Sequence, residues 1–175
     1  MVAAPAPSRP QRGFTLIELV VTLLIVALLA LAALPFARAW TDGNRQLQMR
    51  SQLMEGIGHA RALALRNPHG LTTDAAGAPV EAARLAYDAG THGLRVVQRR
   101  ADGTWPTGAE PPAWQSPPLA GDVSLRLAGH GGAFRCVAFD TRGRPLGSGE
   151  CALPPGVRAL AVGVGNLDPL DVDLL

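Results

Sequence analysis

The chain has 175 residues, of which 47% are hydrophobic and 17% are charged, which excludes a disordered chain with few apolar residues and much charge. All sixteen basic residues are arginine and fourteen residues are acidic, so no strongly basic body is available to bind nucleic acid by charge alone. Two cysteines exclude a disulfide-dense miniprotein and a four-cysteine zinc site, and the 20 glycines and 15 prolines favour turns over a helical bundle.

An apolar stretch, residues 14–34, follows a short leader, residues 1–13, that contains two arginines and no acidic residue. A helix of 21 residues is about 32 Å long, which is enough to cross the hydrocarbon core of a bilayer. The arginines place the leader in the cytoplasm and the rest of the chain outside. The stretch is too long for a secretory signal peptide, and no cysteine follows it closely, as a lipoprotein would need. A plain signal anchor remains as the alternative to a segment with a function of its own.

Glu18 is the one charged residue inside this apolar stretch. A carboxylate at membrane depth costs about 2.5–3.5 kcal/mol on insertion scales, so a functional partner is the default hypothesis. The alternative is that the side chain reaches the membrane surface and is tolerated there.

Residues 12–18, RGFTLIE, resemble the class III signal of type IV pilins and pseudopilins. In that family a prepilin peptidase cleaves after the glycine and methylates the new N-terminus. The resemblance implies cleavage between Gly13 and Phe14, so that Glu18 becomes the fifth residue of the mature chain. Its carboxylate would then pair with the N-terminal amine of a neighbouring subunit and fix the axial stagger between helices. Pro35 would kink or locally open the helix where it leaves the membrane.

A second stretch narrows the resemblance. Residues 60–67, ARALALRN, are similar to the end of the first helix in the GspH/FimT group, and residues 102–105 and 139–144 also fit. This group comprises the H-type minor pseudopilins of type II secretion and related minor pilins of type IV pili. The resemblance implies an α+β, pilin-like fold, in which a long N-terminal helix with a transmembrane first half packs on a small antiparallel sheet.

The periodicity of the chain also predicts a long helix that ends before Pro68. Its second half carries apolar residues at helical spacing, namely Leu47, Met54, Ile57, Ala60 and Ala64. Gly56 and Gly58 each lower helix propensity by about 1 kcal/mol, so packing must hold this half. The predicted parts are a class III leader peptide (1–13), a transmembrane and assembly helix (14–35), an amphipathic helix half (36–67) and a periplasmic β-rich domain (68–175).

Short alternating or apolar runs after Pro68 predict antiparallel strands. A hairpin is predicted around the turn at 88–93, and a second turn at 102–103. The five prolines within 106–118 predict a surface loop. The predicted strands are 85–87, 94–98, 123–127, 134–139 and 158–162. One amphipathic helix against a small antiparallel sheet is an α+β arrangement.

Cys136 and Cys151 both lie on the outer side of the membrane by the topology argument, where disulfides persist. A bond between them would close a loop of about 15 residues and contribute about 3 kcal/mol in the chain-entropy model. The alternative is two buried free thiols, because cysteine also fills hydrophobic cores.

Arg142 and Arg144 are the main basic candidates for nucleic-acid binding, and Arg99 and Arg100 form a second basic pair. Some minor pilins of the GspH/FimT group bind DNA through a basic motif near the C-terminus. The matching region here, 163–168, has no arginine and runs into acidic residues. We therefore expect Arg142 and Arg144 to decorate a type I turn at a strand end, and duplex binding to be no tighter than the ~10⁻⁴–10⁻⁶ M of non-specific contacts.

No catalytic motif is present: the four histidines are scattered, and no phosphate-binding loop or paired carboxylates appear. Asp168, Asp171 and Asp173 lack the order of an EF-hand and favour an exposed acidic tail. We expect no enzyme activity, no metal and no cofactor.

These observations predict a single-pass protein of the cell inner membrane with a cytoplasmic N-terminus and a periplasmic C-terminal domain. By its resemblance it is a minor pseudopilin of the type II secretion system that assembles at or near the tip of the pseudopilus and supports protein secretion. Its partners would be other minor and major pseudopilins or pilins, the prepilin peptidase and the inner membrane, and the charge argues against DNA. The alternative is a minor pilin of a type IV pilus with a role in pilus biogenesis or DNA uptake. A membrane-anchored periplasmic enzyme, the third class, has no motif behind it.

Overall fold

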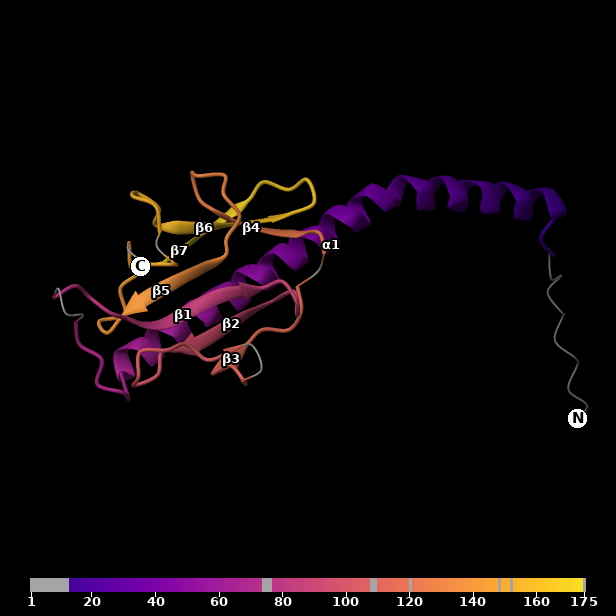
Figure 1. Cartoon of the computed structure of the whole chain (residues 1–175). Helices are drawn as coiled ribbons and strands as arrows, with labels where there is room; N and C mark the ends of the chain where they lie inside the picture. The colour runs from indigo at the N-terminus through magenta and orange to yellow at the C-terminus, as the bar shows by residue number, and fades with distance from the viewer. Residues whose placement is uncertain are drawn as a thin grey trace, which may run out of the picture. The chain divides into compact units, whose positions relative to one another are not determined.

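The computed structural model describes residues 13–73, 77–107, 110–119, 121–147, 149–151 and 153–174. The chain forms two compact units, Met1–Trp40 and Thr41–Leu175, and one helix, α1 (Leu16–Arg66), contributes to both (Figure 1). In the first unit every described residue is exposed. The helix continues through Pro35 without a break, so of the two effects predicted for this proline, a kink or a local opening, the opening is absent.

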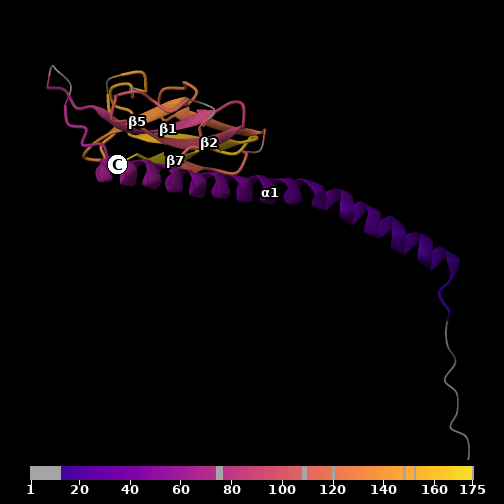
Figure 2. The same cartoon turned by 60° about the horizontal axis from the view of Figure 1, so that its bottom comes forward.

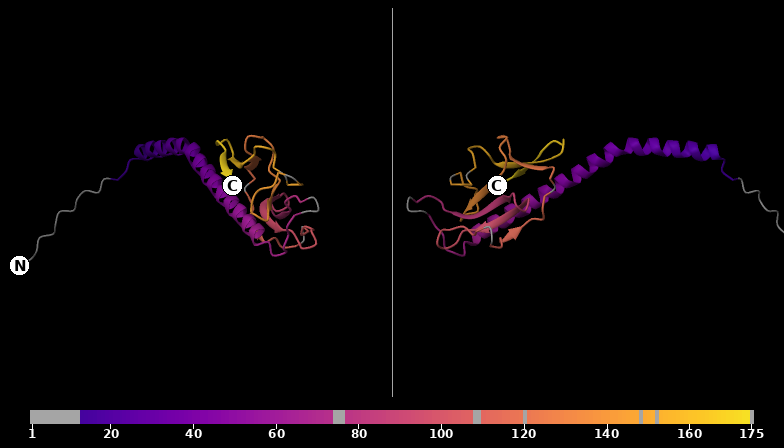
Figure 3. Two further views of the ribbon diagram at one scale, coloured as in Figure 1. Left: turned by 90° about the vertical axis from the view of Figure 1, so that its left-hand side faces the viewer. Right: turned by 45° about the vertical axis from the view of Figure 1, so that its right-hand side comes forward.

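In the second unit, one face of α1 is buried against the strands, as Figures 2 and 3 show from three directions. Its buried residues recur at helical spacing: Gln46, Met49, Leu53, Gly56, Ile57, Ala60 and Ala64. The predicted period is right for the last three of these. It is wrong for Leu47 and Met54, which are 56% and 53% exposed, because at about 100° per residue both lie roughly 100–120° around the helix from the centre of the buried face.

The one buried polar side chain of α1 is fully paired on its donor side. The Gln46 Nε2 atom donates to the carbonyl oxygens of Val162 at 3.0 Å and Asp168 at 2.7 Å. These bonds satisfy a buried amide that would otherwise cost stability, and they fix the helix against two separate segments of the second unit.

The helix ends at Arg66 because Asn67 takes a left-handed conformation, with φ of 38°. Its side chain closes the turn that follows, since its amide donates to the Leu71 carbonyl at 2.6 Å and accepts from the Leu71 N–H at 2.9 Å. Asparagine tolerates this conformation better than most residues, and proline follows it. The predicted end before Pro68 is confirmed.

The strands form two antiparallel sheets rather than the single small sheet that was predicted. The first has the order β3-β2-β1-β5 and the second the order β4-β6-β7. The first sheet consists of β1 (Glu81–Asp88), β2 (Gly93–Gln98), β3 (Trp114–Gln115) and β5 (Cys136–Asp140). The second consists of β4 (Val123–Leu127), β6 (Ala159–Val164) and β7 (Leu170–Asp173). A single core cluster takes residues from α1 and from both sheets, which makes the predicted α+β fold correct.

The predicted hairpin is present, with Leu85 opposite Val96 and Asp88 opposite Gly93. Asp88 closes its turn, because one carboxylate oxygen accepts the Gly90 N–H at 2.9 Å. This bond, supported by the Thr91 N–H and by Arg95, lowers the pKa of the Asp88 carboxyl.

Two segments differ from the sequence prediction. The proline-rich stretch 106–118 was predicted as a loop, but it contains β3, in which Trp114 pairs with Val96. The acidic C-terminal segment was predicted as an exposed tail, but residues 170–173 form β7 on the edge of the second sheet. Val172 is buried there, and so is Leu174 just after it, while the aspartates of β7 face solvent.

α1 lies close to the first sheet at Gly56. A Cβ atom at this position would lie 3.0 Å from both Leu85 Cδ1 and Trp114 Cζ3. The Trp114 ring also stacks on His59, with ring centroids 5.6 Å apart, and its Nε1 donates to Glu55 at 3.1 Å. Packing at this position therefore favours glycine, and Trp114 of the short strand β3 covers the helix here.

Candidate processing and assembly segment

The predicted cleavage site, Gly13–Phe14, lies outside the helix and is exposed, while the leader before it lies outside the described residues. A Cβ atom on Gly13 would meet nothing within 4 Å, and its φ is not in the left-handed region. Neither packing nor backbone conformation in the described chain therefore requires glycine here.

Thr15 sets the start of α1. Its hydroxyl accepts the backbone N–H of Glu18 at 3.3 Å, and its carbonyl accepts the N–H of Leu19 at 3.2 Å. This is an N-cap arrangement, and Thr15 with Glu18 has the spacing of a capping box. Thr15 was missed in the sequence analysis, although the threonine followed three residues later by a glutamate was the signal that could have identified it. The cap leaves Gly13 and Phe14 outside the helix and places Glu18 in its first turn.

The residues after the cap are apolar on all sides of the helix and are exposed among the residues that the structure describes. Exposed large side chains run from Phe14 to Leu34, and α1 is the helix in the described part of the chain that is long and apolar enough to cross a membrane. Thr22 adds no unpaired polar group, because its hydroxyl donates to the Leu19 carbonyl at 2.8 Å. Glu18 is thus the single group in this stretch whose charge calls for an external partner.

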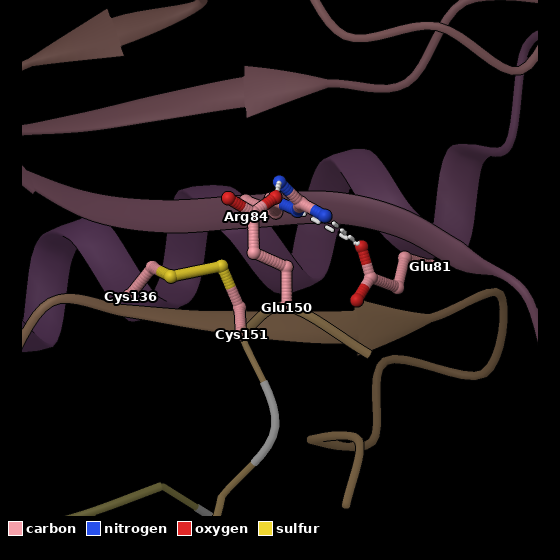
Figure 4. The surroundings of a disulfide bond; sticks show 5 residues. All are labelled: Glu81, Arg84, Cys136, Glu150 and Cys151. Carbon is pink, nitrogen blue, oxygen red and sulfur yellow. Dashed lines mark hydrogen bonds and ion pairs between the residues drawn. A yellow bond between two sulfur atoms is a disulfide. The ribbon is translucent and has the colours of Figure 1, made fainter. Parts of the chain in front are cut away.

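Cys136 and Cys151 are joined in a disulfide in the second unit, as predicted, with their Cα atoms 5.2 Å apart. Figure 4 shows the bond beside an ion-pair cluster formed by Arg84 with Glu81 and Glu150. The bond ties the start of β5 to the end of the 141–151 loop that follows this strand. The alternative of two free thiols does not apply to this structure.

Arg142 and Arg144 lie in a turn that directly follows β5. One carboxylate oxygen of Asp140 accepts both their backbone N–H groups, at 2.9 and 2.8 Å, and its other oxygen pairs with the Arg144 guanidinium at 3.1 Å. Gly143 takes a positive φ of 71° and donates to the Asp140 carbonyl. The position of the turn agrees with the prediction, and the charge of Arg144 is largely balanced.

The other basic candidates are also occupied. The Arg99 Nε donates to the Gly103 carbonyl at 2.7 Å, and Arg100 pairs with Glu110. Within the described ranges, no group of three or more histidine, cysteine, aspartate or glutamate side chains is placed to hold a metal ion. The described residues thus present an exposed Gly13–Phe14 peptide bond followed by an exposed apolar helix.

The comparisons with known proteins concern this N-terminal segment. Residues 8–34 match the family model of the prokaryotic N-terminal methylation motif. The chain carries a type IV pilin-like prepilin signal. No curated protein and no solved structure gives a significant match.

The matched segment contains the cleavage site, the Thr15 cap and Glu18. It supports a type IV pilin or pseudopilin, and it implies processing by a prepilin peptidase and assembly with other pilins. The prepilin-like signal and the long apolar helix are consistent with anchoring in the inner membrane.

Proposed function

We propose that this chain is a minor pseudopilin of a type II secretion system and that it assembles at or near the tip of the periplasmic pseudopilus. The observation that carries the proposal is the methylation motif at residues 8–34, which joins an exposed cleavage site to an apolar helix that is exposed throughout the described part of residues 13–40. The similarity of residues 60–67 to the GspH/FimT group supports the narrower assignment.

The proposed role is structural, not enzymatic. Cleavage after Gly13 frees the amine of Phe14, and assembly moves the 14–34 helix from lipid into a bundle of like helices. In that bundle the Glu18 carboxylate pairs with the amine of a neighbouring subunit, which neutralises two charges in a medium of low dielectric and selects one register. The second unit lies in the periplasm and presents the recognition surface.

A minor pilin of a type IV pilus that binds DNA is the second candidate. It rests on the exposed side chain of Arg142, which has no acidic partner among the residues that the structure describes. Arg144 and Arg100 are both paired, so few positive charges remain to gather on one face. A duplex titration at two salt concentrations would favour this candidate only if binding were submicromolar and lost in an Arg142→Ala, Arg144→Ala double variant.

The test of the first proposal uses the full chain expressed together with a set of secretion pseudopilins. Glu18→Ala should remain in the membrane fraction, because it removes a charge from the membrane-spanning stretch, but cross-link far less to neighbouring subunits. Thr22→Ala is the matched control, since the Thr22 hydroxyl is satisfied within its own helix and should not matter for assembly. Equal incorporation of Glu18→Ala would contradict the charge-pairing mechanism, and a wild-type chain absent from secretion pseudopili would contradict the assignment to this machine.

A further inference from the structure

The loop that carries Cys151 is docked on the first sheet by contacts other than the disulfide. Leu146 donates its N–H to the Ala138 carbonyl of β5 at 2.9 Å, and Leu153 donates to the Leu146 carbonyl at 3.1 Å. Ala138, Leu146 and Cys151 form a small buried cluster of their own. These contacts bring the loop to β5 but do not by themselves determine where the Cys151 sulfur points.

Arg84 lies at the point where the loop meets β1. Its guanidinium pairs with Glu81 at 2.5 Å on one side and with Glu150 at 2.9 Å on the other. The Trp105 ring lies 3.9 Å from the guanidinium carbon and supports it by a cation–π contact. The arginine side chain is only 14% exposed, so it is held in one position by its surroundings.

Three consecutive loop residues contact three neighbouring groups on the sheet. Gly149 lies so close to the Glu81 carboxylate that a Cβ atom would clash with it, and its φ of 95° also favours glycine. Glu150 pairs with Arg84, and Cys151 bonds to Cys136. The first two contacts involve no sulfur, so they can form in the dithiol chain.

The strand register connects these contacts. Arg84 lies opposite Ala138, and Ala86 lies opposite Cys136, so Arg84 and Cys136 occupy neighbouring positions on two paired strands. The ion pair between Arg84 and Glu150 therefore holds Glu150, the residue next to Cys151, close to Cys136. Figure 4 shows the Glu81–Arg84–Glu150 cluster and the disulfide side by side.

We propose that Arg84 is a positioning residue for the Cys136–Cys151 disulfide, and that its ion pair with Glu150 holds Cys151 beside Cys136 before the bond forms. In the reaction the two thiols lose two electrons and two protons to a disulfide oxidant, which is reduced to two thiols. One cysteine first forms a mixed disulfide, and the second attacks it to release the second thiol. Arg84 takes no part in this chemistry, and its role does not depend on filament assembly.

The experiment measures how strongly the chain favours its own disulfide. The full chain in detergent is equilibrated with mixtures of reduced and oxidised glutathione, quenched with an alkylating agent and weighed by mass spectrometry. At half oxidation, the square of the reduced glutathione concentration divided by the oxidised glutathione concentration gives the effective concentration of one cysteine near the other. Arg84→Gln should lower this value about tenfold, since it removes two charge-assisted contacts, and Glu150→Gln should lower it about threefold, since Glu150 is 78% exposed.

Two further variants make the result specific. The double variant Arg84→Gln, Glu150→Gln should behave like Arg84→Gln alone, because the two residues act through one contact. Glu110→Gln breaks a comparable ion pair with Arg100, which does not contact the cysteines, and should leave the effective concentration unchanged.

Wild-type values for both Arg84→Gln and Glu150→Gln would overturn the proposal, as would an equal loss in Glu110→Gln. If Arg84→Gln does not fold, the exposed Glu150→Gln decides by itself: a threefold loss supports the role of Arg84, and no loss refutes it.

Discussion

The two halves of α1 are parts of one helix, yet their side chains have opposite environments. Every described residue before Thr41 is exposed, including a continuous series of leucine, isoleucine and valine side chains. In the second half seven residues at helical spacing are buried against two sheets. The first half therefore depends on a solvent or partner outside its own chain, whereas the second half is stabilised by the chain itself.

The difference follows from the pattern of residues. A helix that is apolar on all sides belongs in a membrane or inside an assembly, and one with a single apolar face packs on a domain. On its apolar face the second half has Gln46, whose side-chain amide is hydrogen-bonded, and Gly56, which lies close to Leu85 and Trp114. In the first half, none of the described residues is buried. The residues that distinguish this half, Gly13, Thr15 and Glu18, lie at its start.

The largest effect is expected at the start of the first half. Gly13→Val should abolish cleavage and leave the full-length precursor in the membrane. The reason is that a branched side chain should not fit a prepilin peptidase pocket that accepts only the hydrogen of glycine. The chain has open space around Gly13, so the variant should fold and insert like wild type. Immunoblots of membrane fractions from cells with and without the prepilin peptidase measure this. Normal processing of Gly13→Val would show that the peptidase does not require glycine at this position.

Substitutions at two leucines distinguish the buried face of the second half from its exposed face. Leu53→Ala should lower the free energy of unfolding by about 2–5 kcal/mol, because Leu53 is fully buried in the core. Leu47→Ala should change it by less than about 0.5 kcal/mol, because Leu47 is exposed. Denaturant unfolding of the second unit, followed by tryptophan fluorescence of the full chain in detergent, compares the two. Equal effects would mean that the buried face is assigned wrongly.

A pair of glycines provides a smaller and sharper test. Gly56→Ala should destabilise the second unit by about 1 kcal/mol, since the added methyl group meets Leu85 and Trp114 at 3.0 Å and the strain exceeds the gain in helix propensity. Gly58→Ala should stabilise it by about 0.5–1 kcal/mol, because nothing lies within 4 Å of the new atom. The same unfolding measurement applies, and a stabilising Gly56→Ala would contradict the close approach of α1 to the sheet.

The sequence predicted those elements whose pattern and turn chemistry agree. The β1–β2 hairpin has alternating residues and a turn closed by Asp88, and the strand 123–127 was predicted with the bounds that β4 has in the structure. The prediction failed for β7, because aspartates alternate with its buried residues and resemble a solvated tail. It failed for β3 because this strand has only two residues, Trp114 and Gln115, which lie among prolines. The Trp114 ring packs on His59 of α1, which is distant in the sequence.

At the candidate site, local signals were sufficient and distant ones were not. The motif around Gly13 and Glu18 is contiguous, so it could be identified from residue order alone, and Thr15 belonged to the same short pattern. The Arg84–Glu150 pair joins residues that are 66 positions apart in the sequence. The hydrogen bond from Gln46 to the Val162 carbonyl joins residues 116 positions apart. Such contacts depend on the strand order and register, which no single stretch of this sequence contains.

The measurement that tests the central claim most directly is the intact mass of the protein isolated from membranes of cells that contain the prepilin peptidase. The expected result is a chain that begins at Phe14 and carries one added methyl group at its N-terminal amine, with two hydrogens missing at the Cys136–Cys151 bond. A chain that retains Met1, or one that begins after Ala37, would contradict the assignment of the first half of α1 as the assembly helix of a pilin-like protein.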